Sequence, residues 1–456
     1  MIKKLLIANR GEIARRVIRT CKEMGIHSIA VYSEADQYAP HVFEADESHL
    51  IGPSRVDESY MNIDKILTAA KKAGADAIHP GYGFLSENAS FAERCRDENI
   101  IFIGPSPDII RQMGDKTAAR KAMRDAGVPV VPGSVGIVGS AEEAMSSAGK
   151  IGYPIMLKAS AGGGGIGMQE VHDEKELMKA YASNSKRAKT FFGDGSMFLE
   201  KKLENARHIE IQIIGDSFGN VIHLFERECS IQRRNQKVLE EAPSSFISDE
   251  TRRQMAETAV RAANTLNYSS AGTIEFLVDE REKFYFLEMN TRIQVEHPVT
   301  EEITGTDIVE LQINVANNKK LPFTQEQIKY RGKAIEARIY AEDHRTFFPS
   351  PGHIDTFHPP CGEDIRNEIA VTENYQVTPY YDPMIGKLIV KGETREAAIK
   401  RLKTALSQYR IGGIKTNLPM LREIIESEAF QKGETTTSFV QDHYIPNIST
   451  VEKEEK

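Results

Sequence analysis

The chain has 456 residues, a length that at roughly 150 residues per domain predicts about three packed units. With 40% hydrophobic and 27% charged residues, the composition is typical of a folded α/β protein and excludes the disordered, collagenous and disulfide-stapled classes. Acidic residues outnumber basic ones and leave a formal net charge of −8, which argues against nucleic acid as a partner because a phosphate backbone needs a basic surface.

The cysteines and the apolar runs indicate the compartment. The four cysteines include no CxxC pair, which fits reduced thiols rather than disulfides. The apolar stretch at residues 5–8 ends at Asn9 and Arg10, far short of a secretory signal. No apolar run approaches the roughly 18 to 20 residues that a membrane helix needs. We therefore expect a cytoplasmic protein without membrane contact.

The first hundred residues alternate short apolar runs with helical periodicity, a pattern typical of a parallel sheet covered by helices. The turn after the first strand lacks the G-x-G-x-x-G of dinucleotide-binding folds, so an NAD site is disfavoured. A block at residues 79–83 ends a strand at the carboxyl edge of this sheet, where open α/β folds place ligands. Strands are expected at residues 4–8, 27–33, 77–79 and 100–103.

A charged helical connector leads to a segment with its own strands, at residues 153–159 and 196–203. Between them lies a glycine tract whose backbone N–H groups are free to approach an anion. Lys158 before the tract would complete a phosphate cradle, and Lys116 in the connector is a weaker candidate. The P-loop order G-x-x-x-x-G-K-[ST] is absent, so a flexible loop is the alternative interpretation.

The remaining sequence mixes strands and helices, with long antiparallel signals. It ends in a strand at residues 385–390 and a helix at 394–408, for which Thr394 is a good N-cap. The segments at 232–237 and 291–298 mix both charges and fit a binding site for a small anion beside a base. Surface ion pairing is the alternative for these two segments.

The most informative pattern is a predicted hairpin formed by residues 273–278 and 284–290. Because side chains alternate along a strand, Glu288 and Asn290 share a face, and a register that pairs Glu275 with Glu288 would bring the three polar groups together. Two half-buried carboxylates repel one another unless a cation lies between them, and oxygen ligands suit Mg²⁺ or Mn²⁺. The alternative is an exposed face with ordinary acids. The opposite face would carry Ile274, Phe276, Val278, Leu287 and Met289.

Four motifs carry a resemblance to a known family. They are residues 7–14 (IANRGEIA), residues 79–83 (HPGYG), residues 288–298 (EMNTRIQVEHP) and residues 349–352 (PSPG). In this order and at these spacings the chain resembles the biotin carboxylases of the ATP-grasp superfamily over roughly residues 1 to 445.

The resemblance implies an α/β and α+β multidomain fold. It would comprise a Rossmann-like N-terminal domain over residues 1–103, a helical connector over 104–130, a glycine-rich ATP-grasp lid domain over 131–203, an ATP-grasp core with a C-terminal mixed α/β domain over 204–446, and a tail over 447–456.

The resemblance also implies an ATP-dependent ligase that carboxylates biotin with bicarbonate through carboxyphosphate, giving ADP, phosphate and N1′-carboxybiotin. Two Mg²⁺ or Mn²⁺ ions would be held by Glu275 and Glu288, with Asn290 beside them. The residues implied for ATP are Lys116 and Lys158 at the phosphates, Gly162, Gly163, Gly164, Gly165 and Gly167 in the lid, Glu200, Lys201 and Leu203 at the adenine, and His208 and Gln232 at the ribose or phosphates.

For the second half of the site, the family implies a base, an anion pocket and a biotin contact. Glu296 would remove the proton of bicarbonate, and Arg338 would stabilise the biotin enolate with Tyr82 near the ureido ring. Ile166 and Asn235 depart from residues common in relatives, but neither removes a metal ligand or the base, so we expect activity. Bicarbonate would lie against Lys237, Arg292, Gln294 and Val295.

The partners follow from the same resemblance. No Ala-Met-Lys-Met biotinylation motif occurs, so biotin is expected on a separate biotin carboxyl carrier protein, with carboxyltransferase subunits completing an acetyl-CoA or other acyl-CoA carboxylase. A homodimer is expected, with Arg19, Glu23 and Arg366 at the interface. The alternatives are another ATP-grasp ligase, such as a carbamoyl-phosphate synthetase-like or purine-pathway enzyme, and a nucleotide-sensing scaffold. A nicotinamide-dependent dehydrogenase is the least favoured alternative.

Overall fold

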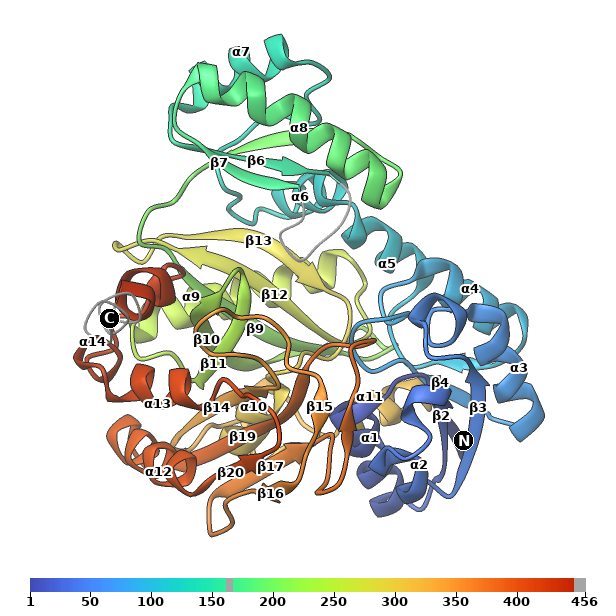
Figure 1. The fold of residues 1–456 in the computed structure, drawn as a ribbon. Helices are drawn as coiled ribbons and strands as arrows, with labels where there is room; N and C mark the ends of the chain where they lie inside the picture. Colours follow the sequence, from blue (N-terminus) through green and yellow to red (C-terminus); the bar gives the residue numbers. More distant parts are fainter. Residues whose placement is uncertain (161–166, 447–456) are drawn as a thin grey trace.

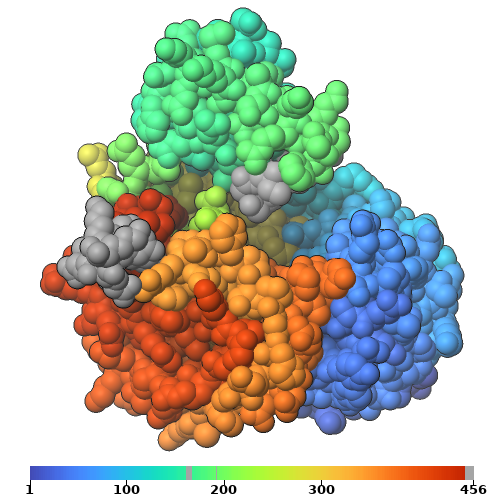
Figure 2. Space-filling view, viewed as in Figure 1, coloured from blue at the N-terminus to red at the C-terminus, as the bar shows by residue number. Residues whose placement is uncertain are grey.

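The computed structural model describes residues 1–160 and 167–446. Figure 1 shows an N-terminal α/β unit in blue, a smaller unit in green that stands above the rest, and a large body from yellow-green to red. In Figure 2 the surface is recessed between the green unit and the body below it. In these described residues no helix has both the length and the apolar character needed to cross a membrane.

The N-terminal unit contains the expected parallel sheet. Its five strands lie in the order β3-β2-β1-β4-β5, and every neighbouring pair is parallel. The strand at residues 47–52 was not foreseen, because its sequence is polar and only partly buried. The strands are β1 (Lys4–Ile7), β2 (His27–Ser33), β3 (Glu47–Gly52), β4 (Ala77–His79) and β5 (Ile101–Phe102), and the helices α1 (Gly11–Glu23), α2 (Pro40–Glu44), α3 (Ile63–Ala73) and α4 (Ala89–Asp97).

The connector is helical, as predicted. It consists of α5 (Pro107–Gly114) and α6 (Lys116–Asp125), and the carboxylate of Asp115 caps α6 by accepting from the backbone N–H groups of Thr117 and Ala118. The cap fixes Lys116 as the first residue of α6.

The green unit is a three-stranded antiparallel sheet under two helices. Leu157 and Leu199 of this sheet are fully buried with apolar residues of the helices, so the unit has its own core. Its elements are α7 (Ala141–Ile151), β6 (Ile155–Ala159), β7 (Met168–Val171), α8 (Glu174–Phe192) and β8 (Met197–Lys201).

The large body is built on one antiparallel sheet of eight strands in the order β13-β12-β9-β10-β11-β14-β19-β17. The pairing of β11 with β14 joins segments about ninety residues apart in the sequence and makes the face of the sheet continuous. The strands are β9 (Arg207–Gly215), β10 (Val221–Arg233), β11 (Gln236–Ala242), β12 (Ser270–Val278), β13 (Phe284–Asn290), β14 (Lys333–Tyr340), β17 (Ile365–Ile369) and β19 (Met384–Gly392).

Helices pack on this sheet and seal its core. The predicted C-terminal helix is present, and the Thr394 hydroxyl accepts from the backbone N–H of Ala397 as its N-cap. Two short ribbons, β15 with β18 and β16 with β20, lie outside the large sheet. The remaining elements are α9 (Asp249–Thr265), α10 (His297–Thr304), α11 (Ile308–Ala316), α12 (Arg395–Gln408), α13 (Leu418–Glu426), α14 (Glu428–Gln431), β15 (Gly352–His353), β16 (Thr356–His358), β18 (Gln376–Val377) and β20 (Arg410–Gly412).

The predicted hairpin is β12 with β13, and its register pairs Glu275 with Glu288 as expected. The expectation for Leu287 was wrong. The register shifts after Glu275 so that Phe276 pairs with Phe286, which leaves Leu287 as an extra residue in a β-bulge. The bulge reverses the alternation: Phe286 enters the core, and Leu287 lines the cavity described below.

The core beneath this hairpin generates a stability prediction. Phe276 is fully buried and contacts Phe284 edge-to-face at a centroid distance of 5.4 Å. We expect Phe276→Ala to lower the free energy of unfolding by about 3–5 kcal/mol, because it removes apolar contacts and leaves a cavity. The matched control Phe218→Ala, at a side chain 49% exposed, should change it by less than about 0.5 kcal/mol. Denaturant unfolding of both variants measures this, and equal effects would contradict the assigned core.

Candidate active site

A cavity of about 750 Å³ lies where the three units meet. The turn after β1 and Tyr82 line it from the N-terminal unit, and the face of the large sheet forms its floor. Glu296 lies just beneath the floor, fully buried. The predicted residues in its lining are Tyr82, Lys116, Lys158, Glu200, Lys201, Leu203, His208, Gln232, Lys237, Glu275, Glu288, Asn290, Arg292, Gln294, Val295 and Arg338.

A row of charged side chains crosses the floor of the cavity. Strand register places Glu210 of β9 opposite Glu275 of β12, and Glu275 opposite Glu288 of β13. On the other side, Arg227 of β10 is opposite Glu210 and donates to it from Nε at 2.6 Å. Residues directly opposite one another on neighbouring strands point to the same face, so the sheet itself concentrates these acids.

Lys237 on β11 is a cation that three buried carboxylates share. Its Nζ lies 2.6 Å from a carboxylate oxygen of Glu210, 3.0 Å from one of Glu275 and 2.7 Å from one of Glu296. Burial alone would lower the pKa of Lys237, but these three carboxylates hold it well above its usual value. Burial likewise opposes ionisation of Glu275 and Glu296, yet Lys237 holds the pKa of each well below its usual range. Glu296 is therefore deprotonated at neutral pH.

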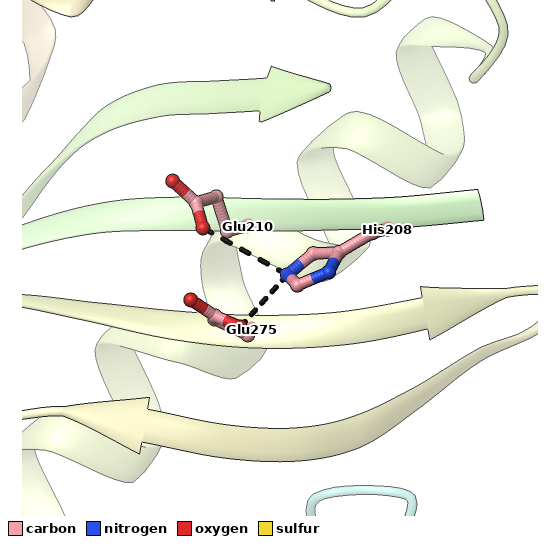
Figure 3. Close-up of side chains that lie close together, drawn as sticks. All are labelled: His208, Glu210 and Glu275. Atoms are coloured by element: carbon pink, nitrogen blue, oxygen red, sulfur yellow. Dashed lines mark ion pairs between the residues drawn. The ribbon is translucent and has the colours of Figure 1, made fainter. Parts of the chain in front are cut away.

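Glu275 is also held by neighbouring amides and an imidazole. The side-chain N–H groups of Asn290 and Gln294 each donate to it at 2.8 Å. His208 Nε2 lies 2.7 Å from its other oxygen and 3.9 Å from Glu210, as Figure 3 shows. His208, Glu210 and Glu275 place one ligand atom each within 4.8 Å of one another, so this trio could also contribute to a metal site.

Glu288 differs from the other acids of the row, because no ion pair to it is present in the described part of the chain. Burial raises the pKa of Glu288, and the charge of Glu275 raises it further, while Lys116 opposes the rise. A carboxylate in this position lacks a cation. With Glu275 and Asn290 on the same face, the donor set is all oxygen and fits a hard divalent ion such as Mg²⁺.

Arg338 and Arg292 add positive charge to the cavity. Arg338 Nη2 lies 3.0 Å from a carboxylate oxygen of Glu296. Arg292 donates from Nε to Glu87 at 2.8 Å and from Nη2 to the Asn290 side-chain oxygen at 2.8 Å. Lys237 and Arg338 donate to Glu296, and Arg292 adds a further positive charge near it, as an anion pocket beside a base requires.

The green unit and the connector helix α6 both bring charged residues to the cavity. Lys158 and Arg120 both donate to Glu200, which is buried. Burial lowers the pKa of Lys116, and Glu288 opposes that shift. The Lys201 ammonium instead donates to the backbone oxygens of Gly152 and Tyr153, so it points away from the cavity.

The glycine tract falls partly outside the described residues. Gly162, Gly163, Gly164 and Gly165, together with Ile166, lie there, and Gly167 is at the edge of the described chain with a φ of +75°. Asn235 occupies the turn between β10 and β11 with a φ of +64°, a conformation that asparagine tolerates better than most residues. This turn explains an asparagine at that position.

Sequence reasoning missed several charged residues of this site. Glu210 and Gln212 alternate with isoleucines in β9 after His208, and that alternation was a usable signal for an inward polar face. Arg227, Glu87 and Glu240 carried no such signal, because only strand order and tertiary packing bring them to the site.

The shared role of Lys237 generates a second prediction. We expect Lys237→Met to lower the free energy of unfolding at neutral pH by about 3–5 kcal/mol, because it leaves buried carboxylates without their cation. The folded-state pKa values of these carboxylates then rise, so the native state binds protons as the pH falls. The loss of stability therefore shrinks as the pH is lowered from about 8 to about 5. Lys121→Met, at an exposed ion pair with Asp125, serves as the control. A pH-independent loss would contradict the shared-charge interpretation.

Comparison with known proteins agrees with this geometry. Three family models match the chain: "Biotin carboxylase, N-terminal domain" over residues 1–110, "Carbamoyl-phosphate synthase L chain, ATP binding domain" over 115–324, and "Biotin carboxylase C-terminal domain" over 336–442. Biotin carboxylase 2 of Bacillus subtilis is 61% identical over 443 residues, which cover 97% of this chain and 100% of that protein.

Solved structures give the same result for the fold. A biotin carboxylase from Campylobacter jejuni, described as a β,γ-ATP complex, superposes with a TM-score of 0.96 at 52% identity and covers 97% of this chain and 99% of that one. The biotin carboxylase domain dimer of 2-oxoglutarate carboxylase from Hydrogenobacter thermophilus, described with MgADP, ADP and bicarbonate, gives 0.95 at 50% identity, with 97% and 98% covered. These matches confirm the predicted multidomain α/β fold, and the chain belongs to the biotin carboxylase family.

Proposed function

We propose that this protein is an ATP-dependent ligase that carboxylates biotin with bicarbonate. The observation that carries the proposal is the single cavity in which the Glu275–Glu288 row, the Lys237–Glu296 pair and Arg338 meet. Each of these three parts suits a different substrate, namely a nucleotide with its metal, a small anion that loses a proton, and an acceptor that develops negative charge. Similar structures described with ATP, MgADP and bicarbonate support the assignment.

The nucleotide would lie between the green unit and the sheet. Lys116 and Lys158 would neutralise its phosphates, the glycine tract with Gly167 would cover them, and Glu200, Lys201 and Leu203 would line the adenine. In that arrangement Lys201 acts through its backbone, because its ammonium is engaged by two carbonyl oxygens. His208 and Gln232, joined by a 2.9 Å hydrogen bond, would contact the ribose or the phosphates.

Glu275 and Glu288, with Asn290 beside them, would hold the divalent ions. Such ions, Mg²⁺ or Mn²⁺, neutralise charge on the phosphates as the phosphoryl group transfers. The position of Glu288, without a cation of its own, supports this role.

Bicarbonate would bind against Lys237, Arg292 and the backbone at Gln294 and Val295. Glu296, ionised and held by Lys237, would take its proton. The bicarbonate oxygen would then attack the γ-phosphorus, so that a new O–P bond forms, the bond to ADP breaks and carboxyphosphate results. The donors are in place before reaction, so little reorganisation is needed.

Carboxyphosphate would release CO₂ and a basic phosphate. That phosphate would remove the proton from N1′ of biotin, and Arg338 would donate to the developing enolate oxygen while N1′ attacks CO₂. Tyr82, whose hydroxyl donates to Glu12, would pack near the ureido ring. The green unit above the cavity would exclude water, which would otherwise hydrolyse the intermediate.

The proposal extends to the protein that carries biotin and to the other partners. We propose biotin on a separate carrier protein, because the chain covers the full length of a relative named biotin carboxylase. The final substrate stays open between acetyl-CoA or another acyl-CoA and a 2-oxo acid, since the Hydrogenobacter structure belongs to 2-oxoglutarate carboxylase.

The Hydrogenobacter structure is a dimer, which supports a homodimer here. Of the three proposed interface residues, Arg19, Glu23 and Arg366, the two arginines both pair with Glu368.

The proposed reaction is tested by measuring ADP release from the purified protein with bicarbonate and biotin each present or omitted. We expect turnover to require bicarbonate and to rise with free biotin, with carboxybiotin as product, because the anion pocket and Arg338 serve these two substrates. Turnover without bicarbonate, or biotin that stays uncarboxylated, would favour another ATP-grasp ligase. ATP binding without turnover would favour a nucleotide-sensing protein.

The base is tested by Glu296→Gln. We expect the affinity for MgATP to change by less than about threefold and biotin carboxylation to fall by about 10²-fold or more, because general-base catalysis is worth that much. Glu302→Gln, at a half-buried carboxylate of α10 that pairs with Arg366, is the control. Unchanged turnover of Glu296→Gln would refute the role of this carboxylate.

A further inference from the structure

A second pair of buried acids lies behind Arg338 and has no part in the mechanism above. Glu240 on β11 is directly opposite Glu336 on β14, and neither side chain is exposed. Directly opposed residues of an antiparallel pair have Cβ atoms about 4.5–5.5 Å apart on one face of the sheet. Two ionised carboxylates at that separation, away from water, would repel one another strongly.

The hydrogen bonds of this pair are unequal. Arg338 Nε donates to Glu240 at 2.6 Å, while Arg338 Nη2 reaches Glu296 at 3.0 Å. The guanidinium of Arg338 therefore lies between two carboxylates, that of Glu240 on the side away from the cavity and that of Glu296 on the cavity side. The other oxygen of Glu240 and both oxygens of Glu336 have no hydrogen-bond partner in the described chain.

Nearby cations cannot balance two charges here. Lys387, opposite Arg338 in the register of β14 with β19, donates to the Val295 backbone oxygen at 2.6 Å and pairs with Glu12 at 3.0 Å. An isolated ionised carboxylate in such a place takes up a proton instead of staying charged. Burial raises the pKa of Glu240 to about 7, although Arg338 opposes the rise. Burial raises the pKa of Glu336 well above its usual value, although Lys387 opposes the rise, and the charge of Glu296 adds to both shifts. The charged and titratable groups that face the pair are Arg338, Lys387, Lys237, Glu296, Cys229 and Tyr340.

We infer that Glu240 is the positioning residue of Arg338 and that Glu336 behind it is uncharged at neutral pH, so that the two acids carry one negative charge between them. The inference deepens the proposed function and rests on it where biotin is concerned. The ionised Glu240 holds the Nε edge of the guanidinium, which leaves the Nη groups directed at the cavity. Because Glu336 is neutral, Arg338 faces two ionised carboxylates and not three. Its positive charge therefore remains available to the biotin enolate.

The positioning role is tested by Glu240→Gln. We expect kcat/KM for free biotin to fall at least about tenfold further than kcat/KM for ATP, because Arg338 serves the biotin step. Glu241→Gln is the matched control. Glu241 is the next residue of β11 and is also buried, but it lies on the other face of the sheet. There it pairs with an arginine, Arg395, at 2.7 and 2.8 Å. Glu241→Gln should change the ratio of the two constants by less than about twofold. An unchanged ratio in Glu240→Gln, or equal changes in both variants, would overturn the positioning role.

The charge state of Glu336 is tested without any activity, by thermal unfolding of Glu336→Gln and the parent protein at about pH 5.5 and pH 8.5. A carboxyl that is neutral when folded and ionised when unfolded makes the parent less stable as pH rises, and glutamine removes that loss. We expect the melting temperature of Glu336→Gln relative to the parent to rise with pH. A constant or falling difference, or a variant that does not fold, would overturn the inference. Failure of the proposed function shows separately, as a parent protein that makes no carboxybiotin.

Discussion

The site depends on one electrostatic constraint, the burial of many carboxylates on one face of an antiparallel sheet. Strand register brings Glu210, Glu275 and Glu288 into a row, and an ionised carboxylate away from water must be paired or lose its charge. Lys237 and Arg227 meet this need at one end of the row. At the other end Glu288 has no ion pair among the described residues, which supports the proposed metal and nucleotide site there.

The same constraint ties the fold to the chemistry. The large sheet runs without interruption from the hairpin β12–β13 to β14 and β19, so residues from distant parts of the chain face one cavity. Glu296 is the residue just before α10, a helix that packs across β10, β11 and β14, and it is therefore reached by both Lys237 and Arg338. In the proposed reaction, proton removal from the anion and stabilisation of the enolate would therefore take place at neighbouring residues.

Much of this arrangement could be predicted from the sequence, and the failures have physical causes. The parallel strands and the pairing of Glu275 with Glu288 followed from periodicity and turn chemistry. The bulge at Leu287 did not, because an extra residue in a strand leaves the composition unchanged while it reverses the alternation. Glu240 and Arg227 were missed because their partners come from other strands. No single segment of the sequence determines the order of strands in a long antiparallel sheet.

The central claim is that the Glu275–Glu288 end of the row binds a divalent ion together with a nucleotide. Anomalous diffraction from crystals of the protein grown with Mn²⁺ and a non-hydrolysable ATP analogue tests it most directly. The account predicts manganese peaks against the carboxylates of Glu275 and Glu288, beneath the nucleotide phosphates and facing Lys116. Manganese bound away from Glu288, or a nucleotide bound in the cavity with no metal at these two residues, would contradict it.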